Sequence, residues 1–212
     1  EQWKKKKYRP YSCKKLIELL IRIKAGFPCW ARLTRLFRDI PAWQIKSGCK
    51  ILNLRELIKR EMKKRNLFCS CIRCREVMEK YNPKEKIFFF RENYQASGGK
   101  EIFLSLENKK RTKLFAYLRL RVPSEALFPV LENSLIVREI KTLGASMALG
   151  KKGTSPQHRG LGKKLLKEAE KIAKKELKTK KIAVIAGIGA RPYFRKLGYR
   201  LKETYMVKKI SK

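Results

Sequence analysis

Apolar residues recur every three to four positions in the first third of the chain, which is the spacing of an amphipathic helix. One helix is predicted within 13–28, where Gly26 and Pro28 end the pattern, and a second over 53–67, with Asn53 as its N-cap. The side chains expected on the buried faces are Leu16, Leu19, Leu20 and Ile23 in the first helix and Leu54, Leu57, Ile58 and Met62 in the second.

Beyond residue 84 the pattern changes to short β-rich runs separated by turn residues. Strands are expected at 86–94, 100–108, 113–123, 134–144, 181–187 and, as one closing strand, 199–210. A long helix is expected at 160–177 and a short one at 191–198. The long helix should turn inward its residues Leu161, Leu165, Ala169, Ile172 and Ala173. This order of elements predicts an α+β fold, with a mixed, mostly antiparallel sheet and flanking helices.

The charge of the chain is strongly positive, because 55 Lys and Arg against 18 Asp and Glu give a formal net charge of +37. An enzyme acting on a small neutral molecule has no need of such a self-repelling field. No apolar run approaches the roughly 20 residues that span a bilayer, and the basic residues are spread along the chain rather than set on one amphipathic helix. We therefore expect a nucleic acid as partner, and no membrane.

Basic residues are frequent in the first 75 positions, where arginines recur at every third residue from 32 to 38. Contacts of this kind with phosphate supply most of the affinity for a nucleic acid. The residues expected to contact RNA are Arg32, Arg35, Arg38, Lys63, Lys64, Arg73 and Arg75. A solvated surface is the simpler explanation for any single lysine, but a solvated surface as a whole would mix both signs of charge.

Three of the six cysteines lie close together as C-x-C-x2-C at Cys69, Cys71 and Cys74. Thiolates at this spacing are suited to wrapping a tetrahedral Zn²⁺ rather than to an ordinary disulfide framework. A chance cluster of reduced cysteines is the alternative. The fourth ligand is open: Cys49 or Cys29 could fold back, or it could come from a part outside this chain.

Turn residues and glycines open the long helix in the stretch 155–163. A helix N-terminus offers unpaired N–H groups and a partial positive charge, and Gly160 and Gly162 would let a ligand approach the backbone. Arg159 and Lys163 add charge at the same place. The stretch therefore predicts a phosphate-binding turn, with an ordinary helix start as the alternative.

A series of motifs then makes a family resemblance specific. In order they are RDIP (38–41), NLR (53–55), CSCIRCREV (69–77), YQASGGKEIFLSLE (94–107), LRLRVPS (118–124), IVRE (136–139), QHRGLGKKLLKEAE (157–170) and IAGIGARPYFRKLGY (185–199). The last two resemble the acetyl-CoA signature of the GCN5-related N-acetyltransferase superfamily. The whole series, covering nearly the entire chain, resembles the C-terminal part of the catalytic subunit of Elongator, most closely its archaeal form.

This resemblance implies a domain plan and a function. It implies the basic, helical tail of a radical S-adenosylmethionine domain over 1–68, a zinc-binding linker over 69–84 and an acetyl-CoA-binding domain over 85–212. The family attaches a carboxymethyl group derived from acetyl-CoA to C5 of uridine 34, in the anticodon stem-loop of tRNA. Its 4Fe-4S cluster sits on a C-x3-C-x2-C motif that this chain lacks. We therefore expect the cluster and S-adenosylmethionine only in a domain outside this chain, which starts at Glu1 like a cut edge.

The resemblance also implies site residues. The expected cofactor-binding residues are Glu139, Ile140, Lys141, Thr142, Gln157, His158, Arg159, Gly160, Leu161, Gly162, Lys163, Tyr193 and Phe194. Glu139 is expected as a base, His158 as a loop residue with a catalytic role, and Tyr193 as the acid that protonates the departing thiolate. The superfamily often has a tyrosine where this chain has Phe194, and Lys141 to Gly144 replace the family's H-V-Y-G.

The leading function is thus the acetyl-CoA- and tRNA-binding portion of a tRNA uridine(34) carboxymethylating acyltransferase, expected in the cytoplasm. One alternative is a protein lysine acetyltransferase, which would need an acidic or open peptide groove. Another is a non-catalytic, zinc-containing RNA-binding module whose acetyltransferase fold is vestigial. The sequence leaves open which tRNAs are chosen and whether the chain forms a homodimer.

Overall fold

The computed structural model describes residues 2–36, 40–78, 82, 84–144 and 160–210. Within it the chain divides into two compact units, Glu1–Arg75 and Glu76–Lys212. Each unit has its own hydrophobic core. The domain boundaries expected at residues 68 and 84 stay predictions.

The first unit is built on two packed helices, α1 (Cys13–Ala25) and α2 (Leu54–Lys64), with the short helices η1 (Ala42–Gln44) and α3 (Ile72–Arg75). Helix α1 begins at Ser12, whose Oγ accepts a hydrogen bond of 3.3 Å from the Lys15 backbone N–H. The core of this unit consists of Leu20, Ile21, Leu54, Ile58, Met62, Cys69 and Cys71.

The buried face of α1 differs from the face that the sequence predicts. Ile23 is 43% exposed, whereas Lys24 is only 3% exposed. The prediction was wrong at Ile23 because hydrophobic spacing cannot anticipate a buried ammonium group. Lys24 has a polar partner: its Nζ lies 3.6 Å from Sγ of Cys74, which is an exposed residue.

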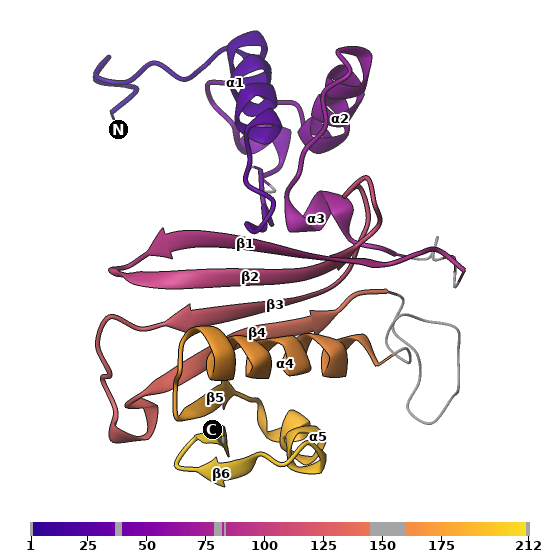
Figure 1. Cartoon of the computed structure of the whole chain (residues 1–212). Helices are drawn as coiled ribbons and strands as arrows, with labels where there is room; N and C mark the ends of the chain where they lie inside the picture. The colour runs from indigo at the N-terminus through magenta and orange to yellow at the C-terminus, as the bar shows by residue number, and fades with distance from the viewer. Residues whose placement is uncertain (1, 37–39, 79–81, 83, 145–159, 211–212) are drawn as a thin grey trace. The chain divides into compact units, whose positions relative to one another are not determined.

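The second unit is a seven-stranded sheet in the order β1-β2-β3-β4-β5-β7-β6 (Figure 1). The strands are β1 (Phe88–Ala96), β2 (Gly99–Glu107), β3 (Leu114–Val122), β4 (Ser134–Thr142), β5 (Lys181–Ile185), β6 (Arg200–Lys202) and β7 (Tyr205–Lys209). All neighbours are antiparallel except β4 and β5. The predicted fold class is confirmed.

One element was predicted wrongly in this unit. The expected single strand over 199–210 is a hairpin of β6 and β7, which turns at Glu203 with a positive φ of 53°. The expected alternation of apolar residues continues on both sides of this turn, so the pattern alone does not mark it.

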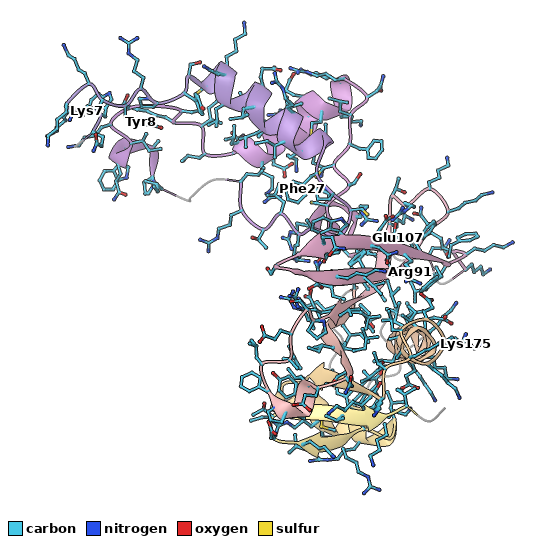
Figure 2. The ribbon with its side chains drawn as sticks, turned by 60° about the vertical axis from the view of Figure 1, so that its left-hand side comes forward. Lys7, Tyr8, Phe27, Arg91, Glu107 and Lys175 are labelled. Carbon is cyan, nitrogen blue, oxygen red and sulfur yellow. A yellow bond between two sulfur atoms is a disulfide. The ribbon has the colours of Figure 1, made fainter. Side chains whose placement is uncertain are left out.

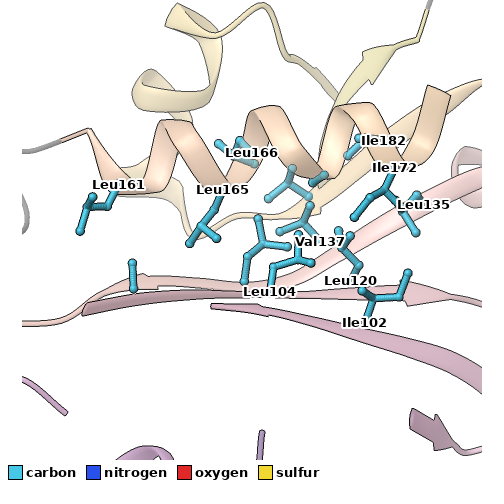
Figure 3. Close-up of a cluster of buried hydrophobic side chains, with 14 of the residues drawn as sticks. Ile102, Leu104, Leu120, Leu135, Val137, Leu161, Leu165, Leu166, Ile172 and Ile182 are labelled. Atoms are coloured by element: carbon cyan, nitrogen blue, oxygen red, sulfur yellow. The ribbon is translucent and has the colours of Figure 1, made fainter. Parts of the chain in front are cut away.

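Helix α4 (Leu161–Lys171) continues into a single π-helical stretch, η4 (Ile172–Glu176), and covers one face of the sheet (Figure 3). All five side chains that were expected to point inward are buried. They pack on Leu104 and Leu120 of the central strands and on Val137 of β4. This packing fixes the start of α4 beside the end of β4, because the helix axis cannot shift without opening the core.

The described part of this unit also contains the short helices η2 (Pro129–Leu131), η5 (Ile188–Ala190) and α5 (Arg191–Lys196). Among the described residues, none of the helices has both the length and the apolar character needed to cross a membrane.

Candidate functional site

The N-terminus of α4 is open to a ligand in the part that the structure describes. Gly160 takes the N-cap position in the left-handed region, with φ 66°, and no side chain of the described residues caps the helix. The first turn contains no acidic residue. Backbone N–H groups of the first turn of a helix have no partner within the helix, so this turn can bind an anion. Gln157, His158 and Arg159 lie outside the described residues.

Gly162, in the same turn, lies where α4, α5 and β4 come close to one another. A Cβ atom at this position would lie 3.2 Å from Tyr193 Oη of α5, 3.7 Å from Thr142 Oγ1 and 3.8 Å from Ile140 Cδ1, both of β4. Four of the expected cofactor-binding residues are thus brought together. A side chain at 162 would fill the space between them, so the geometry favours glycine there.

One edge of β4 near Gly162 is not paired with any described strand. Its pairing with β5 runs only from Ser134↔Lys181 to Val137↔Val184, while its pairing with β3 continues to Thr142. From 138 to 142, therefore, one edge of β4 has no strand partner among the described residues. Such an edge can pair with an extended ligand that carries amide groups.

Glu139 lies on β4 at the centre of a polar network. Tyr117 Oη donates to its Oε1 (2.8 Å), Arg119 Nε donates to its Oε2 (2.9 Å), and Lys141 Nζ lies 2.8 Å from Oε1. Arg119 also donates to Tyr94 Oη over 3.1 Å. Partial burial would raise the pKa of Glu139, but the three donors outweigh it and lower the pKa to about 2. A carboxylate with so low a pKa accepts a proton poorly at neutral pH.

The two aromatic residues of α5 have different surroundings. Tyr193 is 43% exposed, and burial of its remaining surface raises the pKa of its hydroxyl. Phe194 is 3% exposed and packs edge-on against Tyr193 and Tyr199, with ring centroids 5.3 and 5.8 Å away. The hydroxyl that reaches Gly162 is therefore that of Tyr193, whereas Phe194 belongs to the core.

Of the remaining candidates, Leu161 is buried in the core and Lys163 is exposed.

The cysteine motif forms a compact group in the first unit. The Sγ atoms of Cys69, Cys71 and Cys74 all lie within 4.8 Å of one another. Thiol hydrogen bonds from Cys69 and Cys74 lower the pKa of Cys71, and the same contact with Cys71 raises that of Cys69. Tetrahedral zinc with bonds of about 2.3 Å needs sulfur atoms about 3.8 Å apart. The three sulfurs are thus close to the geometry of a zinc site.

The fourth ligand cannot be Cys49 in this structure, because Cys49 forms a disulfide with Cys13. That suggestion from the sequence is corrected. Cys29 lies on a segment tied to the cysteine loop: Arg75 Nη2 donates to the Cys29 carbonyl and Arg75 Nε to the Ser70 carbonyl, both over 2.6 Å. The Ile72 N–H donates to the carbonyl of Ala31 (2.9 Å). Cys29 as fourth ligand stays a prediction.

The residues expected to contact RNA differ in exposure. Arg35, Lys63, Lys64 and Arg73 are exposed, Arg32 is half-buried, and Arg38 lies outside the described residues. Arg75 is only 5% exposed, and its hydrogen bonds to two main-chain carbonyls hold it inside the first unit. Basic side chains occur in both units, from Lys7 in the N-terminal segment to Lys175 in η4 (Figure 2).

Comparison with known proteins finds relatives whose matched regions include both units. Residues 1–64 match the family "Radical_SAM C-terminal domain". The chain is 44% identical over 219 residues to the tRNA uridine(34) acetyltransferase of Methanocaldococcus infernus. The matched region covers 99% of this chain and 41% of that protein. It is 41% identical over 218 residues to the Elongator complex protein 3 of Homo sapiens, covering all of this chain and 40% of that protein.

A solved structure agrees with these sequence matches. It is that of the archaeal Methanocaldococcus infernus Elp3 with an N-terminal deletion (1–46), 44% identical, with a TM-score of 0.88 over 98% of this chain and 51% of that one. The chain spans about two fifths of the length of the curated relatives. Over that share of their length, the chain is therefore homologous to tRNA uridine(34) acetyltransferase and Elongator complex protein 3.

Proposed function

We propose that this chain is the acetyl-CoA- and tRNA-binding portion of an acyltransferase that modifies uridine 34 of tRNA by attaching a carboxymethyl group at C5. The matched relatives carry the names tRNA uridine(34) acetyltransferase and Elongator complex protein 3. This chain has no C-x3-C-x2-C motif, so a 4Fe-4S cluster and S-adenosylmethionine would be bound by residues other than those of this chain. Acetyl-CoA would supply an acetyl group activated as a thioester.

The observation that carries this proposal is the meeting of α4, β4 and α5 around Gly162. The uncapped first turn of α4, with Lys163, would hold the diphosphate. The unpaired edge of β4 from 138 to 142 would pair with the amides of the pantetheine arm. Tyr193 Oη, rather than Phe194, would be the hydroxyl that can give a proton to the departing thiolate.

Glu139 has a different role in this proposal. With three donors on its carboxylate and a pKa of about 2, it holds β3 and β4 in register more readily than it takes a proton. The cysteines 69, 71 and 74 would bind a structural Zn²⁺ that ties the loop together. The remaining assignments are the anticodon stem-loop of tRNA as partner and the cytoplasm as location; a homodimer stays open.

Titration calorimetry with acetyl-CoA tests the proposal. The chain should bind acetyl-CoA, weakly, and Gly162→Val should abolish the heat, because its side chain would occupy the meeting point. Gly26→Ala is the control, since a Cβ there comes no closer than 3.8 Å to any atom and lies in the other unit. No heat with the wild-type chain would favour a non-catalytic RNA-binding module.

Substrate assays separate the enzymatic readings. The chain alone should hydrolyse acetyl-CoA slowly, faster with tRNA, and should leave tRNA unmodified. Acetylation of histone-like peptides, without any effect of tRNA, would instead indicate a protein lysine acetyltransferase.

A further inference from the structure

Lys24 is a lysine inside a hydrophobic core. It stands in the last turn of α1, is 3% exposed, and shares this helix with the core residues Leu20 and Ile21. Its ammonium group makes a described hydrogen bond to Cys74 Sγ, at 3.6 Å. A buried ammonium is costly unless an acceptor of negative charge lies beside it. Its partner here is a sulfur atom of the cysteine cluster.

The charges buried in the first unit are all positive. The buried charged side chains among its described residues are Lys24 and Arg75, and no carboxylate is buried with them. Arg75 donates to the main-chain carbonyl of Ser70, between Cys69 and Cys71, and to that of Cys29. For Lys24, a thiolate at Cys74 is therefore the source of compensating charge that the described contacts offer.

Three thiolates on a divalent cation carry a net charge of −1, and four carry −2. A thiolate that binds a metal keeps lone pairs that accept hydrogen bonds, and such bonds from outside the ligand set tune the site. Three cysteines within 4.8 Å fit a metal of this kind. The ammonium of Lys24 is thus placed to stabilise a metal-loaded, anionic cluster more than a metal-free one.

We propose that Lys24 is a positioning residue of the metal site, which balances the charge of the thiolate cluster through its hydrogen bond to Cys74 Sγ. This inference rests on the proposed zinc site. This role explains why a lysine occupies a buried position of α1 that the hydrophobic pattern does not place on the buried face.

The test measures metal affinity with the full chain. Zn²⁺ and Co²⁺ affinities are determined by chelator competition at fixed pH, and the sulfur-to-Co²⁺ charge-transfer band is recorded. Lys24→Met, which keeps the length of the side chain without the charge, should weaken Zn²⁺ binding about 10- to 100-fold and shift the band. Lys24→Arg should retain most of the affinity. Lys14→Met, an exposed lysine of the same helix, is the matched control and should bind as the wild type does.

Thermal unfolding of the metal-free chain gives a second readout. In the metal-free chain, the buried charge of Lys24 has no metal-bound thiolate to pair with. Lys24→Met removes this charge, so the metal-free variant should melt at the same temperature as the metal-free wild type or above it. A residue that only packs would lower this temperature instead, and that result overturns the proposal. Equal Zn²⁺ affinity and an unshifted band in Lys24→Met overturn it as well.

The absence of metal binding by the wild-type chain would be a separate outcome of the same test. If the wild-type chain binds neither Zn²⁺ nor Co²⁺, the cysteine cluster is no metal site and the role of Lys24 falls with it. The acetyl-CoA assay above does not depend on Lys24 and tests the other unit separately.

Discussion

Glu139 shows how the surroundings of one residue change its chemistry. Its position on β4 suits a base, yet its carboxylate accepts from Tyr117 and Arg119 and pairs with Lys141. Hydrogen bonds to a charged group contribute more than those to neutral groups. The lowered pKa therefore describes an ion-paired group in the fold.

The pH dependence of stability should follow from this pKa. The folded-state pKa of about 2 lies below the ordinary 4.5, so the stabilisation is complete above pH 4.5 and is lost as the pH falls through 2. Glu139→Gln should lower the free energy of unfolding by about 1–3 kcal/mol at pH 7, and the difference should vanish near pH 2. Urea unfolding from pH 2 to 7 measures it. Glu125→Gln, at an exposed position, should show no such trend; a constant difference for Glu139→Gln would contradict the assignment.

The contact between Gly162 and Tyr193 predicts a coupled pair. Alanine is a better helix former than glycine by up to about 1 kcal/mol, but its Cβ would press on Tyr193 Oη at 3.2 Å. Gly162→Ala should therefore raise the free energy of unfolding in a Tyr193→Phe background and raise it less, or not at all, in the wild type. Urea unfolding of the four proteins gives the coupling. Additive effects would show that the two residues do not meet.

At the scale of elements, α4 connects the core to the candidate site. One of its faces is buried on the sheet, while its first turn lies beside the end of β4 (Figure 3). The position of this turn depends on the packing of Leu165 and Ala169, both fully buried.

Loss of that packing should affect both stability and binding. Leu165→Ala should lower the free energy of unfolding by about 2–5 kcal/mol, through lost burial and a cavity. It should also weaken acetyl-CoA binding, because the first turn loses its support. Chemical denaturation and calorimetry measure the two effects. Lys164→Ala, exposed on the next position, should change neither by much; equal losses in both variants would contradict this role of the core face.

At the scale of the whole molecule, the charge of +37 is the dominant property. The described acidic groups are largely used in ion pairs, such as Glu18 with Arg65 and Glu176 with Arg91. The excess positive charge is consequently left for an outside polyanion.

Binding of the proposed partner, a tRNA anticodon stem-loop, should therefore depend steeply on salt. The logarithm of the binding constant should fall linearly with the logarithm of the salt concentration, by about 0.7–0.9 per phosphate contact. Replacing Lys63 and Lys64 with alanine, and so removing two contacts, should reduce this slope by about 1.4–1.8. Fluorescence anisotropy at several salt concentrations gives the slopes. Lys174 and Lys175, replaced in the same way, are the control; an equal reduction would show that binding is not centred on the first unit.

The sequence by itself determined the fold class, the helices α1, α2, α4 and α5 and most strands, because hydrophobic periodicity reports which faces are buried, and the spacing of Cys69, Cys71 and Cys74 indicated their proximity. The tertiary structure decided what depends on distant partners. It paired Cys49 with Cys13, turned the last strand into a hairpin at Glu203 and brought Tyr193 to Gly162. It also buried Lys24 in place of Ile23. A local pattern records the neighbours along the chain, whereas an ion pair, a disulfide or a hydroxyl in a site depends on residues that only folding brings close.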